Sequence, residues 1–415
     1  MRCLLFRLIG LQKTMLVSQI AVCSKITSDT ERLILKTIYD AGMISRADVA
    51  RATHLTRPTV STTVTKFIND GLVAELGQVT NGRGKPATLI QVVDDACSVI
   101  GIDISNRELK GVIFDMRGRP VYSQQRLADY SKPDSIFPTL IDLIDDLIVN
   151  VQESGIPLLG IGIGAPGLMN VQDGSVRMAI NLGWKDFPLQ EKVEKRYQVP
   201  VHVFNDSQAA ALGQFTFDNQ SGAPNLIVIK VGRGISAGII LDGKIYSGSS
   251  FGASEIGHLQ IVDDGEPCIC GHFGCLETVA SSRAIVRKAR MLAENDPGVI
   301  LHSYVESLGD ITTDDVLAAF NTGDPGITKI IEQAGRHIGI IVANLVGILN
   351  IPEIVIAGSL ARFGPTLLNA IRGEMESRAL SNMVAETELK LSNLGQAIVM
   401  QGAASIILHH ELGVI

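Results

Sequence analysis

A short run of cysteine, histidine and glycine residues constrains the fold of this chain more than any other feature. Within residues 255–277 lie His258, Cys268, Cys270, His272 and Cys275, so three cysteines fall within eight positions. One histidine and three thiolates match the four tetrahedral ligands of structural zinc, and the glycines allow tight turns between them. The alternatives are a disulfide, which would leave one cysteine unpaired, or three idle thiols. The pattern predicts a zinc-binding loop.

The spacing of this run and its flanking acids resemble those of the ROK family of repressors and sugar kinases, and the resemblance covers most of the chain. In that family the histidine and three cysteines hold zinc, while the two acids and the histidine contact sugar hydroxyls. The resemblance implies the zinc ligands His258, Cys268, Cys270 and Cys275. It implies sugar contacts from Glu255, His258 and Glu277. The spacing of the competing ligand, His272, matches the family less well.

Charge is distributed unevenly along the chain, whose 415 residues are typical of two or three domains. Residues 1–93 carry 12 Lys and Arg against 6 Asp and Glu, a net charge of +6, which leaves −13 for the remainder. A basic N-terminal part favours contact with nucleic acid, although an ordinary surface could carry the same excess.

The first 23 residues are apolar but do not read as a signal peptide. Arg7 and Lys13 interrupt the apolar run, and no small-x-small cleavage site follows. No other segment offers about 18 uninterrupted apolar residues, the length of a membrane span. We expect a cytoplasmic protein without a membrane partner. Met15 is an alternative start, which would make residues 1–14 an extension without function.

Residues 29–93 have the pattern of a winged helix-turn-helix. A first helix is predicted from Asp29 to about Gly42, a second after Ser45, and a third after Thr56 with Pro58 in its first turn. Strands at 72–76 and 89–93 would form the wing. A helical dimerisation bundle would share much of this pattern, but ROK repressors place a DNA-binding domain before the sugar-binding body.

We expect the third helix and the tip of the wing to contact DNA. Hydroxyl and other short side chains permit close approach to the major groove, and Arg57 stands near the helix start. The glycine-rich wing tip carries two cations and is either a minor-groove contact or a solvated loop. The expected DNA contacts are Arg46, Arg57, Thr59, Ser61, Thr62, Lys66, Arg83 and Lys85.

From about residue 96 onward, strands and helices alternate, which predicts an α/β body. Two strand-turn-strand units, 99–114 and 226–241, indicate a duplicated core. The resemblance implies the two-lobed, actin-like (ribonuclease-H-like) fold of ROK sugar kinases. The expected boundaries are an extension at 1–28, the winged helix-turn-helix at 29–95, a first lobe at 96–205 with 396–415 packing back on it, and a second lobe at 206–395 with the zinc loop at 258–277.

Polar residues follow two strands of the first lobe. The strand at 158–163 precedes residues 164–167, and the strand at 201–204 delivers Asn205 and Asp206 to a helix start. An Asn-Asp pair in that place can be a plain helix cap. In ROK sugar kinases, the Asp matching Asp206 is the base that deprotonates the sugar. The sugar contacts implied for this lobe are Gly167, Asn181, Asn205 and Asp206.

Both phosphate loops depart from the ROK kinase pattern. The kinase Asp-x-Gly-x-Thr is Asp103-Ile104-Ser105-Asn106-Arg107 here, and the kinase Gly-Thr-Gly is Gly232-Arg233-Gly234. Phosphoryl transfer needs backbone N–H groups close to ATP, so large residues in these loops would crowd the triphosphate. We expect Arg107 and Arg233 to stabilise a cleft without ATP or to bind a small anion.

These features predict a sugar-responsive transcriptional repressor of carbohydrate-utilisation genes that is not an enzyme, with Asp206 as a vestigial base position. The expected partners are operator DNA, a monosaccharide or sugar phosphate, and further copies of the chain in a homodimer or dimer of dimers. One alternative is an active ATP-dependent sugar kinase with a fused DNA-binding domain, which the retained Asp103 and Asp206 favour. Another is a non-catalytic scaffold for a transport-system protein.

Overall fold

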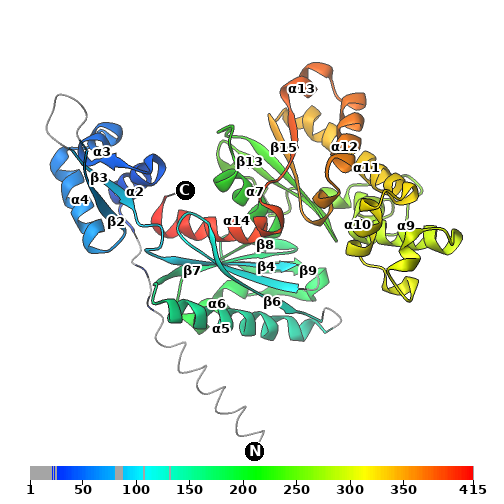
Figure 1. Cartoon of the computed structure of the whole chain (residues 1–415), viewed down its shortest axis with the longest axis horizontal. Helices are drawn as coiled ribbons and strands as arrows, with labels where there is room; N and C mark the ends of the chain where they lie inside the picture. The colour runs from blue at the N-terminus through cyan, green and yellow to red at the C-terminus, as the bar shows by residue number, and fades with distance from the viewer. Residues whose placement is uncertain are drawn as a thin grey trace, which may run out of the picture. The chain divides into compact units, whose positions relative to one another are not determined.

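The chain divides into two compact units (Figure 1). Unit 1 comprises Met1–Ala209 and Val399–Ile415, and unit 2 comprises Ala210–Ile398. The computed structural model describes residues 21, 23, 26–79, 87–105, 108–129 and 132–414. Across these residues, every helix is too short or too polar to traverse a lipid bilayer.

The N-terminal part of unit 1 is a winged helix-turn-helix. Its elements are α2 (Asp29–Ala41), β1 (Ile44–Ser45), α3 (Arg46–Thr53), α4 (Arg57–Asn69), β2 (Val73–Val79) and β3 (Ala87–Val92), with the strands in the order β1-β3-β2. The side chains of Ser45 and Thr56 accept the N–H groups of Asp48 and Thr59, so both predicted caps start their helices. The three predicted helices and the wing are therefore present.

Unit 1 also contains a five-stranded sheet in the order β11-β7-β4-β5-β6, beside a small sheet in the order β10-β9-β8. Strands β4, β7 and β11 are parallel, and β5 and β6 continue antiparallel. The strands are β4 (Ser98–Ser105), β5 (Glu108–Phe114), β6 (Pro120–Leu127), β7 (Leu158–Ala165), β8 (Leu168–Asn170), β9 (Ser175–Ala179), β10 (Trp184–Phe187) and β11 (Val201–Asn205). The helices are α5 (Ile136–Ser154), α6 (Leu189–Tyr197) and α14 (Ile398–Ile407), while α7 (Asp206–Phe217) begins in unit 1 and continues into unit 2.

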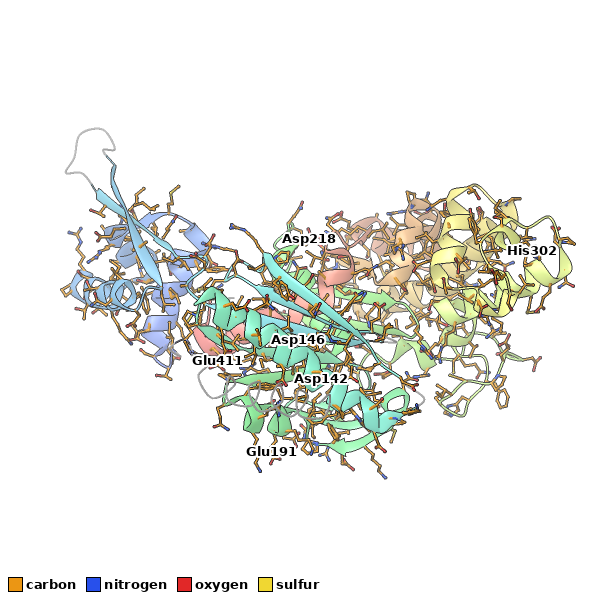
Figure 2. All side chains as sticks on the ribbon, turned by 60° about the horizontal axis from the view of Figure 1, so that its bottom comes forward. Asp142, Asp146, Glu191, Asp218, His302 and Glu411 are labelled. Carbon is orange, nitrogen blue, oxygen red and sulfur yellow. A yellow bond between two sulfur atoms is a disulfide. The ribbon has the colours of Figure 1, made fainter. Side chains whose placement is uncertain are left out.

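Helix α14 covers one face of this sheet while α5 and α6 lie on the other (Figure 1). Two strand glycines allow its close approach, because a Cβ on Gly162 would lie 1.9 Å from the carbonyl oxygen of Ala403 and one on Gly101 would lie 2.1 Å from that of Met400. The helix ends in a π-helical turn, Leu408–Leu412, which contains the buried Glu411 (Figure 2). Glu411 Oε1 lies 3.1 Å from His202 Nε2.

Cys23 and Cys97 form a disulfide that joins the start of the chain to the residue before β4. This pairing was not predicted, because the two cysteines lie 74 positions apart and belong to no motif.

Unit 2 repeats the hairpin-and-parallel-strand arrangement of unit 1. Its sheet has the order β14-β13-β12-β15-β16, in which β12 pairs antiparallel with β13 and parallel with β15. The strands are β12 (Leu226–Val231), β13 (Ile235–Leu241), β14 (Lys244–Ile245), β15 (Glu353–Ala357) and β16 (Glu388–Leu391). The hairpins β4–β5 and β12–β13 lie at the two recurring segments that the sequence singled out.

Helices of unit 2 bury a continuous apolar core against this sheet. They are α8 (Leu276–Ala280), α9 (Ser282–Asn295), α10 (Thr313–Asn321), α11 (Pro325–Leu349), α12 (Gly364–Arg378) and α13 (Ser381–Glu386). Short 3-10 segments in the two units are Pro133–Ser135, Ile180–Leu182, Ile256–His258, Ile300–Ser303, Leu308–Asp310, Ser359–Phe363 and Gly395–Ala397. The zinc loop runs from the segment Ile256–His258 to the start of α8.

Candidate metal centre, effector residues and DNA-binding surface

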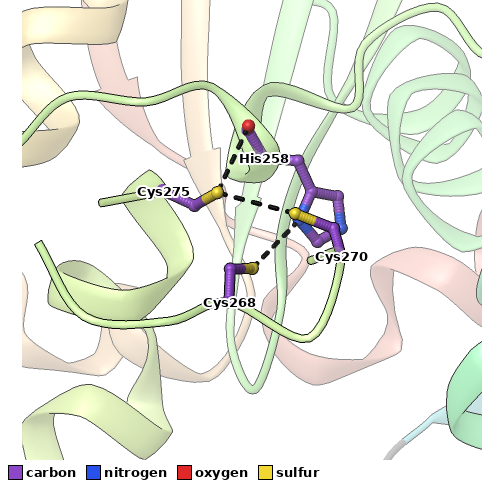
Figure 3. Close-up of side chains that lie close together, drawn as sticks. All are labelled: His258, Cys268, Cys270 and Cys275. Atoms are coloured by element: carbon purple, nitrogen blue, oxygen red, sulfur yellow. Dashed lines mark hydrogen bonds between the residues drawn. The ribbon is translucent and has the colours of Figure 1, made fainter. Parts of the chain in front are cut away.

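The zinc loop brings four nitrogen and sulfur donors together (Figure 3). His258 Nδ1 lies 3.5 Å from Cys268 Sγ, and Cys270 Sγ lies 3.7 Å from Cys275 Sγ. All four donor atoms lie within 4.8 Å of one another. Zinc bonds of about 2.0–2.3 Å in tetrahedral geometry separate ligand atoms by roughly 3.5 Å, so this group is the right size to hold a metal ion.

Glycines of the loop permit this convergence. A Cβ on Gly274 would lie 1.7 Å from the carbonyl oxygen of Val262, and its φ of +67° is in the left-handed region. Likewise, a Cβ on Gly257 would lie 2.1 Å from the carbonyl oxygen of Ile235. The backbone therefore closes on itself immediately beside His258 and Cys275, and these two ligands are held at the ends of rigid segments.

His272, the competing ligand, lies at the exposed tip of the loop. Its Nδ1 is 3.5 Å from Cys270 Sγ, but the compact group of four donors among the described residues contains His258 instead. The backbone of His272 has another role, because its carbonyl oxygen accepts the N–H of Cys268 at 2.7 Å.

The thiols of the loop differ in acidity. A backbone N–H from His272 and the neighbouring side chains lower the pKa of Cys270 to about 6. Burial, together with the adjacent sulfurs, raises the pKa of Cys275 to about 12. Without a positive charge, a second and third thiolate would have to form beside the first at a high cost. A divalent cation removes that cost, so the donor set fits a metal ion.

Metal binding by this group is expected to release protons and to weaken as the pH falls. With a pKa of about 12, the Cys275 thiol is protonated at neutral pH, so the metal must displace at least that proton. Below pH 6 the Cys270 thiolate is also protonated, and a further proton then competes with zinc. Calorimetric zinc titrations in buffers of different ionisation enthalpy measure the released protons. Equal affinity from pH 5 to pH 8 without proton release would contradict this prediction.

In unit 1, Asn205 is a helix cap, one of the two roles expected of it, and it also contacts the glycine turn after β7. Its Oδ1 accepts the N–H of Ser207 at 2.9 Å and so caps α7, while its Nδ2 donates to the carbonyl oxygen of Gly167 at 2.9 Å. Gly167 has a φ of +98°, and a Cβ there would lie 2.3 Å from the carbonyl oxygen of Met178. Asp206, the first residue of α7, is buried, and Asn181 is exposed.

In unit 2, Glu277 is tied to the glycine turn before β13. Its Oε2 accepts the backbone N–H of Ile235 at 3.3 Å, and its Oε1 pairs with the guanidinium of Arg283. A Cβ on Gly234 would lie 3.0 Å from Oε2, so glycine allows the turn to approach the carboxylate. Arg283 was not among the residues expected at this site. The signal was a cation in the first turn of α9, six positions after a candidate sugar ligand.

The second phosphate loop forms a tight turn in which the N–H of Gly232 donates to the carbonyl oxygen of Gly234 at 3.0 Å. The N–H of Ser282, at the start of α9, donates to the carbonyl oxygen of Gly232 at 2.8 Å. Arg233 is half-buried at the tip of the turn. Arg107 lies outside the described residues, so the roles expected of the two arginines stay predictions.

Helix α4 has a buried apolar face and an exposed polar face. Val60, Val64 and Phe67 are fully buried. The exposed residues include Arg57, Thr59, Ser61, Thr62 and Lys66, five of the expected DNA contacts. Such a surface matches a helix that reads the major groove. The wing-tip residues Arg83 and Lys85 lie outside the described residues.

Two of the expected DNA contacts hold the domain together in this structure. Arg46 donates to Ser61 Oγ at 3.2 Å and pairs with Glu75 at 2.9 Å, so it connects α3, α4 and the wing strand β2. Lys66 pairs with Glu31 of α2 at 2.7 Å. Both cations would have to exchange these partners to contact phosphate.

A winged helix-turn-helix on a two-lobed α/β body, with a loop whose four donors fit a metal ion, defines a DNA-binding regulator with an effector domain. A model of the ROK family matches residues 99–410, and a winged helix-turn-helix DNA-binding model matches 27–74. The xylose repressor of Caldicellulosiruptor bescii is 31% identical over 384 residues, which cover 92% of this chain and 95% of that protein. The chain therefore belongs to the ROK family.

Solved structures agree with this assignment. A ROK family transcriptional regulator, a homolog of the Escherichia coli MLC protein, has a TM-score of 0.79 at 26% identity over 92% of this chain and 96% of its own. A ROK family glucokinase from Streptomyces griseus, solved with glucose and AMPPNP, has a TM-score of 0.65 at 28% identity over 74% of this chain and 98% of its own. The predicted fold, a winged helix-turn-helix before a ROK kinase fold, is confirmed.

Proposed function

We propose that the protein is a sugar-responsive repressor that binds the operators of carbohydrate-utilisation genes. The observation that carries this function is the polar, exposed face of α4. It lies on a chain that matches a xylose repressor over 92% of the chain's length. As domain boundaries we propose 29–95 for DNA binding, 96–205 with 396–415 for the first lobe, and 206–395 for the second.

The proposed effector contacts form two sets of residues, one within each unit. Carboxylates and amides suit a neutral polyol, because they accept and donate hydrogen bonds to hydroxyl groups. From unit 1 these residues are Gly167, Asn181, Asn205 and Asp206. From unit 2 they are Glu255, His258 and Glu277. Arg283 supports this proposal, since its pairing with Glu277 holds the carboxylate in one orientation.

Zinc is the metal we propose for the four-donor group. When bound, it would hold the loop between His258 and Glu277 and supply the positive charge that keeps three thiolates together. His258 Nδ1 faces the sulfurs, so its Nε2 is the ring nitrogen available to an effector hydroxyl. Zinc therefore acts on effector binding indirectly, through the orientation of His258 and the position of Glu277.

Sugar phosphorylation is not the function we propose. The xylose repressor of Caldicellulosiruptor bescii aligns with 92% of the chain, whereas the glucokinase structure aligns with 74%. Asp103 and Asp206 are retained, but a buried carboxylate also serves as a hydrogen-bond acceptor for a sugar hydroxyl.

We propose that a homodimer binds the operator, because α4 of each chain would read one half-site. Two copies would read a palindrome with half-sites about 10 bp or a multiple apart. An effector that changes the relative position of the two DNA-binding domains would change DNA affinity. A coupling of about 1–3 kcal/mol corresponds to a change of roughly 5- to 150-fold.

The test is thermal unfolding of the zinc-loaded protein with monosaccharides and their phosphates, each with and without Mg-ATP. We expect one class of sugar to raise the melting temperature regardless of ATP, because a ligand specific to the native state stabilises it. Sugar-dependent stabilisation by ATP, followed by release of ADP, would instead identify a kinase. No shift with any sugar would favour a protein partner as the effector.

A further inference from the structure

One arginine of the first lobe reaches into the DNA-binding domain. Arg117 lies in the turn between β5 and β6, and its side chain is 22% exposed. Its guanidinium donates to the carbonyl oxygen of Tyr39 at 2.8 Å and stands 4.0 Å from the centre of the Tyr39 ring. Tyr39 is in the last turn of α2, where carbonyl oxygens lack helical partners and a cation is favoured.

The contact is reciprocal and is anchored on both sides. The hydroxyl of Tyr39 donates to the carbonyl oxygen of Met116 at 2.8 Å, and Arg117 Nε donates to Asp94 Oδ1 at 2.9 Å. Asp94 belongs to the segment that joins the wing strand β3 to the lobe strand β4. Arg117 thus connects α2, this linker and the lobe, so the linker does not act as a free hinge.

The other end of the same helix face is held by the C-terminal segment. Arg32 donates to the carbonyl oxygen of His410 at 2.8 Å, and Lys36 Nζ lies 3.5 Å from that of Val414. Residues 32, 36 and 39 follow the spacing of one helical face. The opposite face, with Ile34, Leu35 and Ile38, is buried in the core of the domain. Helix α2 therefore has one face in the DNA-binding domain and the other on the lobe.

A series of contacts connects the first lobe with the DNA-reading helix α4. Helix α14, which leads to His410, packs on β4 and β7 at Gly101 and Gly162. Strand β7 leads into the turn that contains Gly167. The carbonyl oxygen of Gly167 accepts a hydrogen bond from Asn205, a proposed effector residue. At the other end of the path, Glu31 of α2 pairs with Lys66 of α4.

We propose that Arg117 is a positioning residue for DNA binding: it fixes the orientation of the winged helix-turn-helix on the first lobe and so sets which operator spacing the paired domains accept. The inference rests on the proposed dimeric operator binding for its functional consequence. The contact itself stands apart from that proposal, because it is made within one chain.

A matched pair of arginines provides the test. Arg119 lies on the same turn and pairs with Asp94 of the linker at 3.1 Å and with Asp115 of the lobe at 3.8 Å, whereas Arg117 also contacts α2. In full-length protein, Arg117→Ala is expected to speed hydrogen exchange of the α2 amides by about tenfold. In the wild type, local opening of α2 has to break the hydrogen bond from Arg117 to Tyr39, and in the variant this bond is absent. Arg119→Ala is expected to leave them unchanged, and Arg117→Lys to restore part of the protection.

Operator spacing gives the functional measurement. A duplex selected by the wild-type protein from a random library is rebuilt with its half-sites moved apart in single base-pair steps. We expect Arg117→Ala to bind displaced half-sites about as well as the original spacing, while the wild type and Arg119→Ala keep one preferred spacing. Unchanged α2 exchange and unchanged spacing preference in Arg117→Ala would overturn the inference. If the wild type prefers no spacing, the proposal of dimeric operator binding is wrong. The hydrogen-exchange measurement then tests by itself whether Arg117 holds α2 on the lobe.

Discussion

Replacing Cys275 with serine is expected to abolish stoichiometric zinc binding and to destabilise unit 2. Cys275 is the buried member of the four-donor group, and a neutral hydroxyl in its place cannot supply the thiolate that zinc prefers. At a free zinc concentration of about 1,000 times the Kd, zinc binding adds about 4 kcal/mol to the free energy of unfolding. Loss of the site should therefore lower the melting temperature by roughly 10 °C. Metal analysis of the purified protein and a thermal scan measure the two effects.

His272→Ala is the matched control for this change. His272 lies two positions from Cys270 on the same loop but outside the four-donor group, so this variant should keep one zinc per chain and the wild-type melting temperature. A zinc-free His272→Ala protein, or a fully loaded Cys275→Ser protein, would show that the ligand set has been assigned wrongly.

Local features of the fold were predictable from the sequence because their causes lie within a few residues. Ser45 and Thr56 cap helices whose first turns follow immediately, and the apolar spacing of Val60, Val64 and Phe67 marks the buried face of α4. The zinc loop is local in the same sense, since its four donors fall within 18 positions of the chain.

Contacts between distant segments could not be predicted in this way. Arg46 and Lys66 were expected on DNA, but each has an acidic partner that only the folded domain brings near, Glu75 and Glu31. Arg283 and the turn at Gly234 meet at Glu277 because α9 starts beside β13. The arrangement of Tyr39 and Arg117 joins residues 78 positions apart. Periodicity and motif spacing contain no information about such pairs.

Replacing Arg57 with alanine is expected to weaken operator binding by about tenfold or more. Arg57 is exposed at the start of α4, where the helix N-terminus favours a phosphate and where a guanidinium can reach a guanine edge. In contrast to Arg46 and Lys66, it pairs with no acidic side chain among the residues that the structure describes. If Arg57 contacts a phosphate, its loss should reduce the salt dependence of binding by about one ion. If it contacts a base, its loss should relax specificity at one position of the operator.

Fluorescence anisotropy on the selected duplex at several salt concentrations distinguishes these two roles. Arg336→Ala removes the same charge from an exposed position on α11 in unit 2, so it controls for the change in net charge. Both variants should keep the wild-type melting temperature, because neither arginine supports a buried group. If Arg57→Ala binds the duplex as tightly as Arg336→Ala at every salt concentration, the exposed face of α4 is not the surface that reads DNA, and the wing becomes the principal candidate.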